Sequence, residues 1–498
     1  MTESGGNPLD DGHHQFDARR LAGRRTIAWS LIQQIGSQAV NYIVFLILAV
    51  VLPPSDFGVV AMASVWLAIL GAFAESGFGA ALVQRAELRP SHVSTTFVIN
   101  LAAGVMLAAL GAALAFPAAA LYRMPAVAPV MTVLAAAFVI RSLSLTQAAL
   151  AQRAVNFRAL AMRDVGSNVA GGVVGVGMAL AGYGVWSLVG MTLVGASVGT
   201  VLLWQVTSWR PRWHEVSRAA AAELWPYSSR VLGFNFFKAI SQNTDRLVIG
   251  FTLGAHAVGL YAFASRLIIL PVTVIVGAFG NYLFPEVARW QHDPRAVRAL
   301  IRRTSRPMLA IVLPGLAGMV MMAPAVVTLF GTQWREAAVL VQVLSVAALM
   351  QVMYSPTGQL MKGLNRPGLL LAWAIGFTPV VAAALWVGSR WGVAGTAIAF
   401  SVIHVVCLPV ILYIARRLAD VRLADLVGVG WPAGLATLAL VACLEVGVAQ
   451  APVYGRSSLV AAAFLGSALY CVVLARLSPS LTAAMNGWLR RRTGVRRA

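Results

Sequence analysis

Residues 58–64 read Gly-Val-Val-Ala-Met-Ala-Ser, and residues 259–265 read Gly-Leu-Tyr-Ala-Phe-Ala-Ser. The two stretches align when the chain is shifted by 201 residues. A shift of 208 residues aligns a second pair, Tyr-Gly-Val at 183–185 with Trp-Gly-Val at 391–393. Two separated matches at nearly one offset predict an internal duplication, which governs the architecture of the whole chain.

Runs of about twenty apolar residues recur along the sequence, the length that spans the hydrocarbon core of a bilayer. Of the 498 residues, 59% are hydrophobic and 11% are charged, against about 45–50% and about 25% in soluble domains. Windows of about nineteen residues predict about fourteen membrane-spanning helices, which start near residues 27, 57, 94, 127, 164, 185, 230, 259, 307, 336, 368, 392, 427 and 457. The sequence therefore predicts an all-α polytopic membrane protein.

Six predicted spans fall in each repeat, and an even number gives both repeats the same orientation in the membrane. We expect two pseudo-symmetric six-helix lobes, related by an axis along the membrane normal, with substrate held between them. The last two spans lie outside the repeat. The predicted segments are a basic N-terminus (1–26), an N-lobe (27–208), a cytoplasmic linker (209–229), a C-lobe (230–415), a peripheral helix pair (416–475) and a basic tail (476–498).

Positive charge is distributed unevenly between the two sides of the predicted membrane. The 38 Lys and Arg residues exceed the 17 Asp and Glu residues, which gives a net charge of +21. Most of them lie in short segments between apolar spans, where they set topology and contact anionic lipids rather than nucleic acid. Of these basic residues, the segments expected on the outside contain four: Arg123, Arg335, Arg390 and Arg456. The positive-inside rule thus predicts that both termini are cytoplasmic, and the polar first 25 residues show no cleavable signal peptide.

The sequence offers little for soluble-enzyme chemistry. Cys407, Cys443 and Cys471 lie in apolar spans without metal-ligand spacing, which predicts neither a disulfide nor a metal site. No GxxxxGK[ST], HExxH or GxSxG motif occurs, so neither ATP-driven transport by this chain nor familiar hydrolysis is indicated. We expect no cofactor and no enzymatic activity. An ion gradient, the membrane potential or consumption of the product would then supply the energy for transport.

Polar residues inside apolar spans are the most informative positions, because they are costly in hydrocarbon and usually face a bundle interior or water. In the seventh predicted span, Asn235, Lys238, Gln242 and Asp245 recur on one helical face, and Arg246 flanks them. This stripe predicts a cavity-lining surface that binds substrate. Hydrogen bonds from helix to helix would also account for it.

The first predicted span carries a matching stripe. Gln34, Ser37 and Asn41 fall opposite the first three residues of the seventh-span stripe under the 201-residue shift. Asp245 and Arg246 fall opposite apolar residues, so charge is confined to the second repeat. The equivalent stripes predict that both helices line one cavity.

Several other charged residues inside predicted spans have two interpretations. Glu75 in the second span and Asp245 in the seventh can each carry a coupling proton or ion. Glu75 can equally cap a helix or pair with Arg85. Arg266 in the eighth span and Arg141 in the fourth can attract a phosphate or extend toward the membrane surface. The sequence alone leaves these alternatives open.

A series of short motifs runs in order along most of the chain. They lie at residues 52–58 (Leu-Pro-Pro-Ser-Asp-Phe-Gly), 75–85, 152–157, 182–189 (Gly-Tyr-Gly-Val-Trp-Ser-Leu-Val), 243–250 (Asn-Thr-Asp-Arg-Leu-Val-Ile-Gly), 261–271, 284–285 and 330–334 (Phe-Gly-Thr-Gln-Trp). In their order and spacing, from about residue 25 to 420, the chain resembles the Wzx-like polysaccharide transporter branch of the MOP flippase superfamily. Two departures remove positive charge near the outer side, since Val50 and Phe251 stand where such families often have basic residues.

The resemblance implies a MOP-type bundle of two lobes in the bacterial inner membrane. It also implies a flippase that moves polyprenyl-diphosphate-linked oligosaccharide from the cytoplasmic to the outer leaflet by alternating access, for lipopolysaccharide or exopolysaccharide biosynthesis. The implied partners are this lipid-linked oligosaccharide, membrane lipids, and the polysaccharide polymerase and export machinery. The amides of Gln34, Asn41, Asn235 and Gln242 suit sugar hydroxyls. Lys238, with Arg246 and Arg266, suits the diphosphate.

Two other functions remain open from the sequence. A MATE-like, cation-coupled drug exporter would favour acidic and aromatic cavity walls, whereas the stripe here contains Lys238. An integral-membrane glycan polymerase or ligase would be expected to place a substantial loop over the outer face, and the predicted outer loops are short. The sequence names neither the glycan nor the coupling ion.

Overall fold

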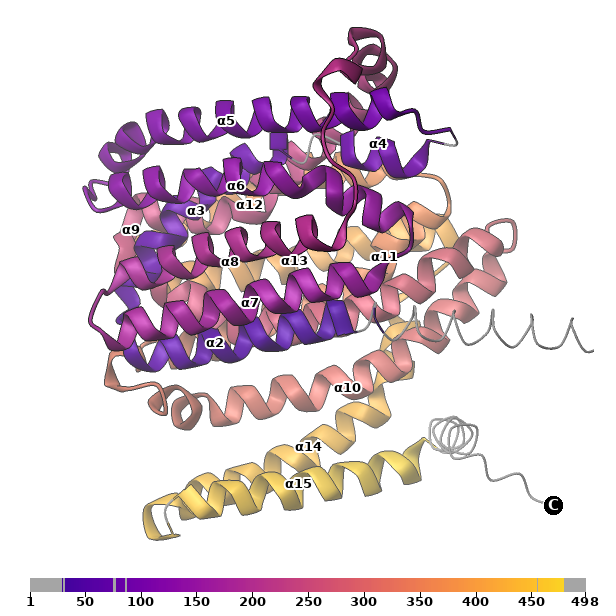
Figure 1. Cartoon of the computed structure of the whole chain (residues 1–498). Coiled ribbons are helices and arrows are strands. Elements are labelled where there is room, and N and C mark those ends of the chain that lie inside the picture. Colours follow the sequence, from indigo (N-terminus) through magenta and orange to yellow (C-terminus); the bar gives the residue numbers. More distant parts are fainter. Residues whose placement is uncertain (1–28, 30–31, 75–77, 86, 455, 479–498) are drawn as a thin grey trace, which may run out of the picture. The chain divides into compact units, whose positions relative to one another are not determined.

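The described part of the protein consists of helices joined by turns and short loops (Figure 1). The computed structural model describes residues 29, 32–74, 78–85, 87–454 and 456–478, and no strand occurs among them. The chain divides into two compact units, unit 1 (Met1–Gly259) and unit 2 (Leu260–Ala498). Glu75, the N-terminal segment 1–26 and residues 479–498 of the predicted basic tail lie outside the described residues.

Unit 1 contains the helices that precede Gly259. They are η1 (Ile32–Gly36), α2 (Ser37–Val51), α3 (Pro54–Ala74), α4 (Phe78–Gln84), α5 (Pro90–Leu121), α6 (Val127–Arg153), α7 (Phe157–Leu180), α8 (Val185–Val206), η2 (Trp213–Glu215) and the first part of α9 (Arg218–Arg289).

Unit 2 contains the remainder of α9 and the helices that follow it. These are α10 (Pro294–Thr328), η3 (Thr332–Trp334), α11 (Ala337–Gly363), α12 (Pro367–Gly388), η4 (Ser389–Trp391), α13 (Gly392–Ala419), α14 (Leu423–Tyr454) and α15 (Arg456–Leu477).

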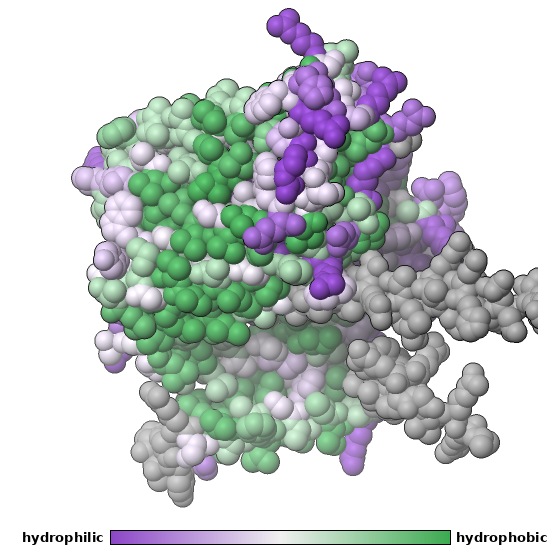
Figure 2. Space-filling model, in the orientation of Figure 1, coloured by the Kyte–Doolittle hydropathy of each residue, from purple (hydrophilic) through white to green (hydrophobic). Residues whose placement is uncertain are grey.

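Ten helical segments of the described chain are long and apolar enough to cross a membrane. The prediction of an all-α polytopic membrane protein is therefore confirmed, while the number of fourteen spans and the predicted segment boundaries stay predictions. Figure 2 shows that the surface over α5, α6 and α8 is largely hydrophobic, and that hydrophilic side chains gather at the end of these helices nearest α4. This distribution suits a bundle with its sides in lipid and that end in water.

Helices α7 and α8 pack with their backbones in close contact. A Cβ atom on Gly171 would lie 2.5 Å from the carbonyl oxygen of Met191, and one on Gly195 would lie 3.1 Å from the carbonyl oxygen of Ser167. Such close approach needs residues without side chains at the crossing, which is the usual way membrane helices gain contact area in lipid. The two helices thus form a rigid wall on which polar side chains can be held.

Helix α9 runs through the junction between the seventh and eighth predicted spans. Gly254, with φ of 82° and ψ of −175°, breaks the helical geometry at that point, a conformation that glycine adopts without steric cost. The 201-residue shift places Gly254 opposite Pro53, which lies between α2 and α3. Both repeats therefore interrupt their first pair of helices at the same position.

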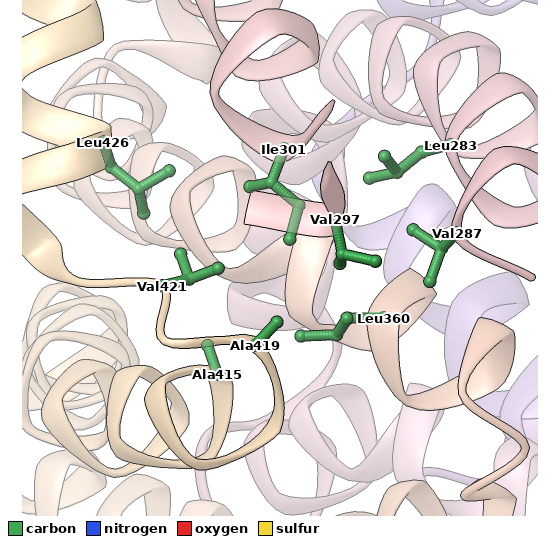
Figure 3. Packing of buried hydrophobic residues seen from close by; sticks show 9 residues of the cluster. All are labelled: Leu283, Val287, Val297, Ile301, Leu360, Ala415, Ala419, Val421 and Leu426. Carbon is green, nitrogen blue, oxygen red and sulfur yellow. The ribbon is translucent and has the colours of Figure 1, made fainter. Parts of the chain in front are cut away.

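Unit 2 is held partly by a cluster of buried hydrophobic side chains, shown in Figure 3. The nine residues are Leu283, Val287, Val297, Ile301, Leu360, Ala415, Ala419, Val421 and Leu426. Beside this cluster, the Arg298 guanidinium binds the Asp425 carboxylate, with distances of 2.8 Å from Nε to Oδ2 and 3.0 Å from Nη2 to Oδ1. Apolar packing and this paired hydrogen bond together hold the start of α14 against α10.

Candidate functional site

The candidate site is a cavity of about 880 Å³ within unit 1. It is lined by residues of α2, α3, α6, α7, α8 and the first part of α9. The polar and charged lining residues are Asn41, Ser64, Arg141, Ser142, Ser144, Arg163, Asp164, Ser167, Asn168, Thr192, Thr200, Asn235, Lys238, Gln242 and Asn243. A cavity of this size, lined by these polar side chains together with apolar ones, is suited to a ligand with a hydrophilic part.

Four of the predicted substrate-binding residues line this cavity together. Asn235, Lys238 and Gln242 lie on one face of α9, as their spacing predicts, and Asn41 lines the cavity from α2. The structure therefore brings part of both equivalent stripes to one cavity. Their roles in binding substrate stay predictions.

The other predicted residues lie elsewhere. Gln34 is exposed outside the cavity lining, and the Asp245 carboxylate accepts a hydrogen bond of 2.8 Å from the backbone N–H of Arg246. Neither Asp245 nor Arg246 lines the cavity. Arg266 belongs to unit 2 and is half-buried. The roles of these residues in substrate binding or ion coupling stay predictions.

Sequence reasoning missed a polar group on α7. The Asp164 carboxylate lies 2.6 Å from the Arg163 guanidinium through Oδ1, and its Oδ2 accepts a hydrogen bond of 2.9 Å from Gln33 Nε2. One turn further along, Asn168 Nδ2 donates to the backbone carbonyl of Ser37 at 3.1 Å. These contacts attach α7 to η1 and α2, and they place Arg163 and Asp164 at the cavity wall.

The sequence feature that could have revealed these residues is Asn156, which marks the start of α7. Its Oδ1 accepts a hydrogen bond of 3.2 Å from the backbone N–H of Ala159 and so caps the start of α7. Asparagine is a favoured residue at this position. A helix starting there places Asp164 two turns inside α7, whereas a span starting near residue 164 places it at the membrane surface.

Positive charge predominates in the cavity. The described lining residues include three cations, Arg141, Arg163 and Lys238, and one carboxylate, Asp164. Asp164 pairs with Arg163, whereas the Lys238 ammonium has no carboxylate partner in the part of the chain that the structure describes. Lys238 is exposed toward this cavity lining, so its ammonium can meet a ligand directly, and the excess of cations over carboxylates favours an anionic one.

The segment that leads into α9 is tied to the polar end of unit 1. Glu223 binds Arg85 and His92, with 3.3 Å between its Oε2 and His92 Nε2. The hydrogen bond with His92, followed by the charge of Arg85, holds the pKa of the Glu223 carboxyl below its ordinary value. Ser94 also donates to Glu215 at 3.0 Å. These contacts fix the entry of the helix that carries Lys238.

Comparison with known proteins identifies the family. A family profile described as "Polysaccharide biosynthesis protein" matches residues 47–339. The chain belongs to the polysaccharide biosynthesis protein family. The succinoglycan biosynthesis transport protein ExoT of Rhizobium meliloti is 28% identical to this chain over 356 residues, which cover 70% of this chain and 71% of ExoT.

Solved structures show the fold that this family member shares. The lipid II flippase MurJ, in an inward closed conformation, matches with a TM-score of 0.70 and 10% identity over 92% of this chain and all of MurJ. An inward-facing multidrug transporter of the MATE family in the MOP superfamily matches with a TM-score of 0.64 and 16% identity, over 78% of this chain and 98% of that one. The polysaccharide biosynthesis protein thus has a MOP-type fold, which lipid flippases and drug exporters have in common.

Proposed function

We propose that this protein is a flippase that moves polyprenyl-diphosphate-linked oligosaccharide from the cytoplasmic to the outer leaflet of the bacterial inner membrane. It acts by alternating access, for surface polysaccharide biosynthesis, with both termini in the cytoplasm. The observation that carries the proposal is the unit 1 cavity, which combines three cations with five amide side chains, those of Asn41, Asn168, Asn235, Gln242 and Asn243.

The two kinds of side chain fit the two parts of such a head group. A glycan cannot cross hydrocarbon unaided, because its hydroxyl groups would lose their hydrogen bonds to water. Amides offer both donors and acceptors in place of that water. Lys238, Arg141 and Arg163 would bind the diphosphate through charge-assisted hydrogen bonds, while the polyprenyl tail stays in the bilayer.

The family supports this function more directly than the fold does. A MOP-type fold accommodates lipid flippases and drug exporters alike, so it does not discriminate between them. ExoT is named as a transport protein of succinoglycan biosynthesis, and its similarity to this chain favours a polysaccharide precursor. The cationic cavity also disfavours the cationic drugs that a MATE-like exporter would carry.

Export of an anionic head group is favoured by a membrane potential that is negative inside. We therefore infer that the potential contributes to transport, with Glu75 and Asp245 as candidates for an additional coupling ion. A polysaccharide polymerase and export machinery would consume the product on the outer side. In this proposal the protein performs no chemical conversion of its own.

The first test is made in a strain that lacks the gene. We expect surface polysaccharide to be lost and lipid-linked oligosaccharide to accumulate on the cytoplasmic face, where an impermeant reagent added from outside cannot reach it. Normal polymer with normal sidedness, in a strain without a second such transporter, would overturn the proposal.

A second test uses the scarcity of lysine in this chain. Lys238 and Lys362 are its two lysines, so an amine-reactive reagent applied to the Lys362→Arg protein reports on Lys238 by peptide mapping. Farnesyl diphosphate should slow the modification of Lys238, and farnesol should not. Equal protection by both compounds, or by neither, would contradict diphosphate binding in this cavity.

A further inference from the structure

The cavity has one carboxylate among its described lining residues, and both oxygens of that carboxylate are occupied. Asp164 Oδ1 accepts from Arg163, with Nε and Nη2 each at 2.6 Å, and Oδ2 accepts from Gln33. In this ion pair the Arg163 side chain is 29% exposed and the Asp164 side chain is 25% exposed. The pair is therefore accessible to a ligand but shielded enough to be electrostatically significant.

The pairing is unusual for neighbouring residues of one helix. Side chains at i and i+1 point in different directions, so the Arg163 guanidinium must turn back to reach Asp164. Its stem lies along α8, where a Cβ atom on Gly199 would be 3.5 Å from Arg163 Cγ. Asp164, itself held by Gln33, thus determines where the guanidinium lies at the cavity wall.

We propose that Asp164 is an internal counter-ion that competes with the phosphate of the substrate for Arg163. This inference rests on the proposed function, because it takes a diphosphate as the ligand of the cavity. When the diphosphate enters, Arg163 exchanges one anionic partner for another, and the net gain is smaller than for an unpaired cation. When the diphosphate leaves, Asp164 again binds Arg163 and offsets the cost of release.

Release is where a transporter needs such a competitor. A cavity with three cations and no carboxylate would hold a diphosphate firmly. Binding that is too strong in the loaded state slows turnover, as it does for any carrier that must bind and then discharge its ligand. Asp164 weakens the bound state without removing the cation that recognises the ligand.

The competition predicts a result that other roles for Asp164 do not. In the full-length protein purified in detergent, Asp164→Asn should bind farnesyl diphosphate about tenfold more tightly, the effect of one charge-assisted contact. Its dissociation rate should fall by a similar factor, and transport should slow. A residue that binds sugar hydroxyls or merely braces α7 would give unchanged or weaker binding of this probe. Glu336→Gln, at an exposed position outside the cavity lining, removes one negative charge as the matched control.

A double-mutant cycle separates competition for Arg163 from a general effect of cavity charge. Arg163→Gln should weaken binding of farnesyl diphosphate, and in that background Asp164→Asn should change the dissociation constant less than about twofold. Equal tightening in both backgrounds would show that the carboxylate acts on the cavity as a whole, and the inference would be wrong. Should Asp164→Asn fold poorly, Asp164→Ser removes the same charge, and Asp164→Glu should bind the probe like the unaltered protein.

The outcomes also separate this inference from the proposed function. Failure of the unaltered protein to bind farnesyl diphosphate would overturn both. If the unaltered protein binds farnesyl diphosphate but Asp164→Asn does not bind it more tightly, the inference alone would be overturned.

Discussion

Gly58 of α3 and Gly259 of α9 each press against the helix that carries the other. A Cβ atom on Gly58 would lie 1.8 Å from the carbonyl oxygen of Ala255, and one on Gly259 would lie 1.8 Å from the carbonyl oxygen of Pro54. Since Pro54 and Ala255 are themselves 201 residues apart, the shift that aligns the repeats also exchanges the two contacts. A self-complementary contact of this kind follows from local two-fold symmetry, which a duplicated pair of helices would supply.

The first prediction concerns this contact. Gly58→Ala and Gly259→Ala should each lower the stability of the detergent-solubilised protein by about 2 kcal/mol or more, because the added methyl group meets backbone rather than a movable side chain. Thermal unfolding measures the loss. Gly177→Ala is the matched control, since no atom lies within 4 Å of its added Cβ. Equal melting temperatures for all three variants would contradict the close contact.

The second prediction concerns Lys238. Lys238→Gln removes the cation that has no carboxylate partner among the described residues, and it should reduce transport at least about tenfold by weakening diphosphate binding. Lys238→Arg should retain most activity, because charge rather than shape is required. The rate at which lipid-linked oligosaccharide reaches the outer leaflet is the measurement. Lys362→Gln, at an exposed position outside the cavity lining, should transport normally, and a similar loss in both Gln variants would remove Lys238 from the site.

The third prediction is a pH dependence at the polar end of unit 1. The pKa of Glu223 is lowered from its ordinary value of 4.5 by His92 and Arg85, so its contacts contribute fully above that value and are lost as the pH falls through the lowered pKa. Glu223→Gln should therefore melt at a lower temperature than the unaltered protein near pH 7, and the difference should shrink below about pH 4.5. Glu87→Gln, at an exposed position, should show no such pattern. A difference that is constant from pH 3.5 to 7 would contradict this assignment.

The fourth prediction concerns the ion pairs at the start of α14. Asp425 is 5% exposed and accepts hydrogen bonds from Arg298 and from the backbone N–H of Arg422 at 2.9 Å. Asp425→Asn removes the charge of the buried carboxylate that Arg298 binds with two hydrogen bonds, and should cost about 2 kcal/mol in thermal unfolding. Asp420→Asn should cost less than about 1 kcal/mol, because Asp420 is 47% exposed and water screens its pair with Arg298. Losses below about 1 kcal/mol for both variants would show that α14 is held mainly by apolar packing.

Helical spacing places Asn235, Lys238 and Gln242 on one face of α9, because the period of a single helix determines which of its own residues share a face. Asn235, Lys238 and Gln242 therefore line the cavity as one stripe. The same spacing could not show where the cavity ends. Asp245 continues the stripe but lies beyond the lining, since the extent of a cavity depends on the neighbouring helices.

The Arg163–Asp164 pair could not be predicted from hydropathy, because windowed averages place a helix start where polarity falls. Helix α7 begins at Phe157, and hydrogen bonding by Asn156 rather than apolarity determines that start. The fold class could be predicted because it follows from the apolar composition and the length of the apolar runs, both of which hydropathy windows measure. The charges of the cavity depended on a capping side chain and on tertiary contacts, which windows do not represent.

The tight crossing of α7 and α8 has a consequence for the range of glycans that related transporters could carry. At Gly171 and Gly195 the two backbones touch, so that wall can neither recede nor accept bulkier residues. On α3 and α6 the cavity is lined partly by alanines, including Ala68 and Ala148, where a larger side chain would reduce the space without disturbing a backbone contact. Adaptation to shorter or longer sugar chains is therefore expected at such alanine positions rather than at the glycines of the α7–α8 crossing.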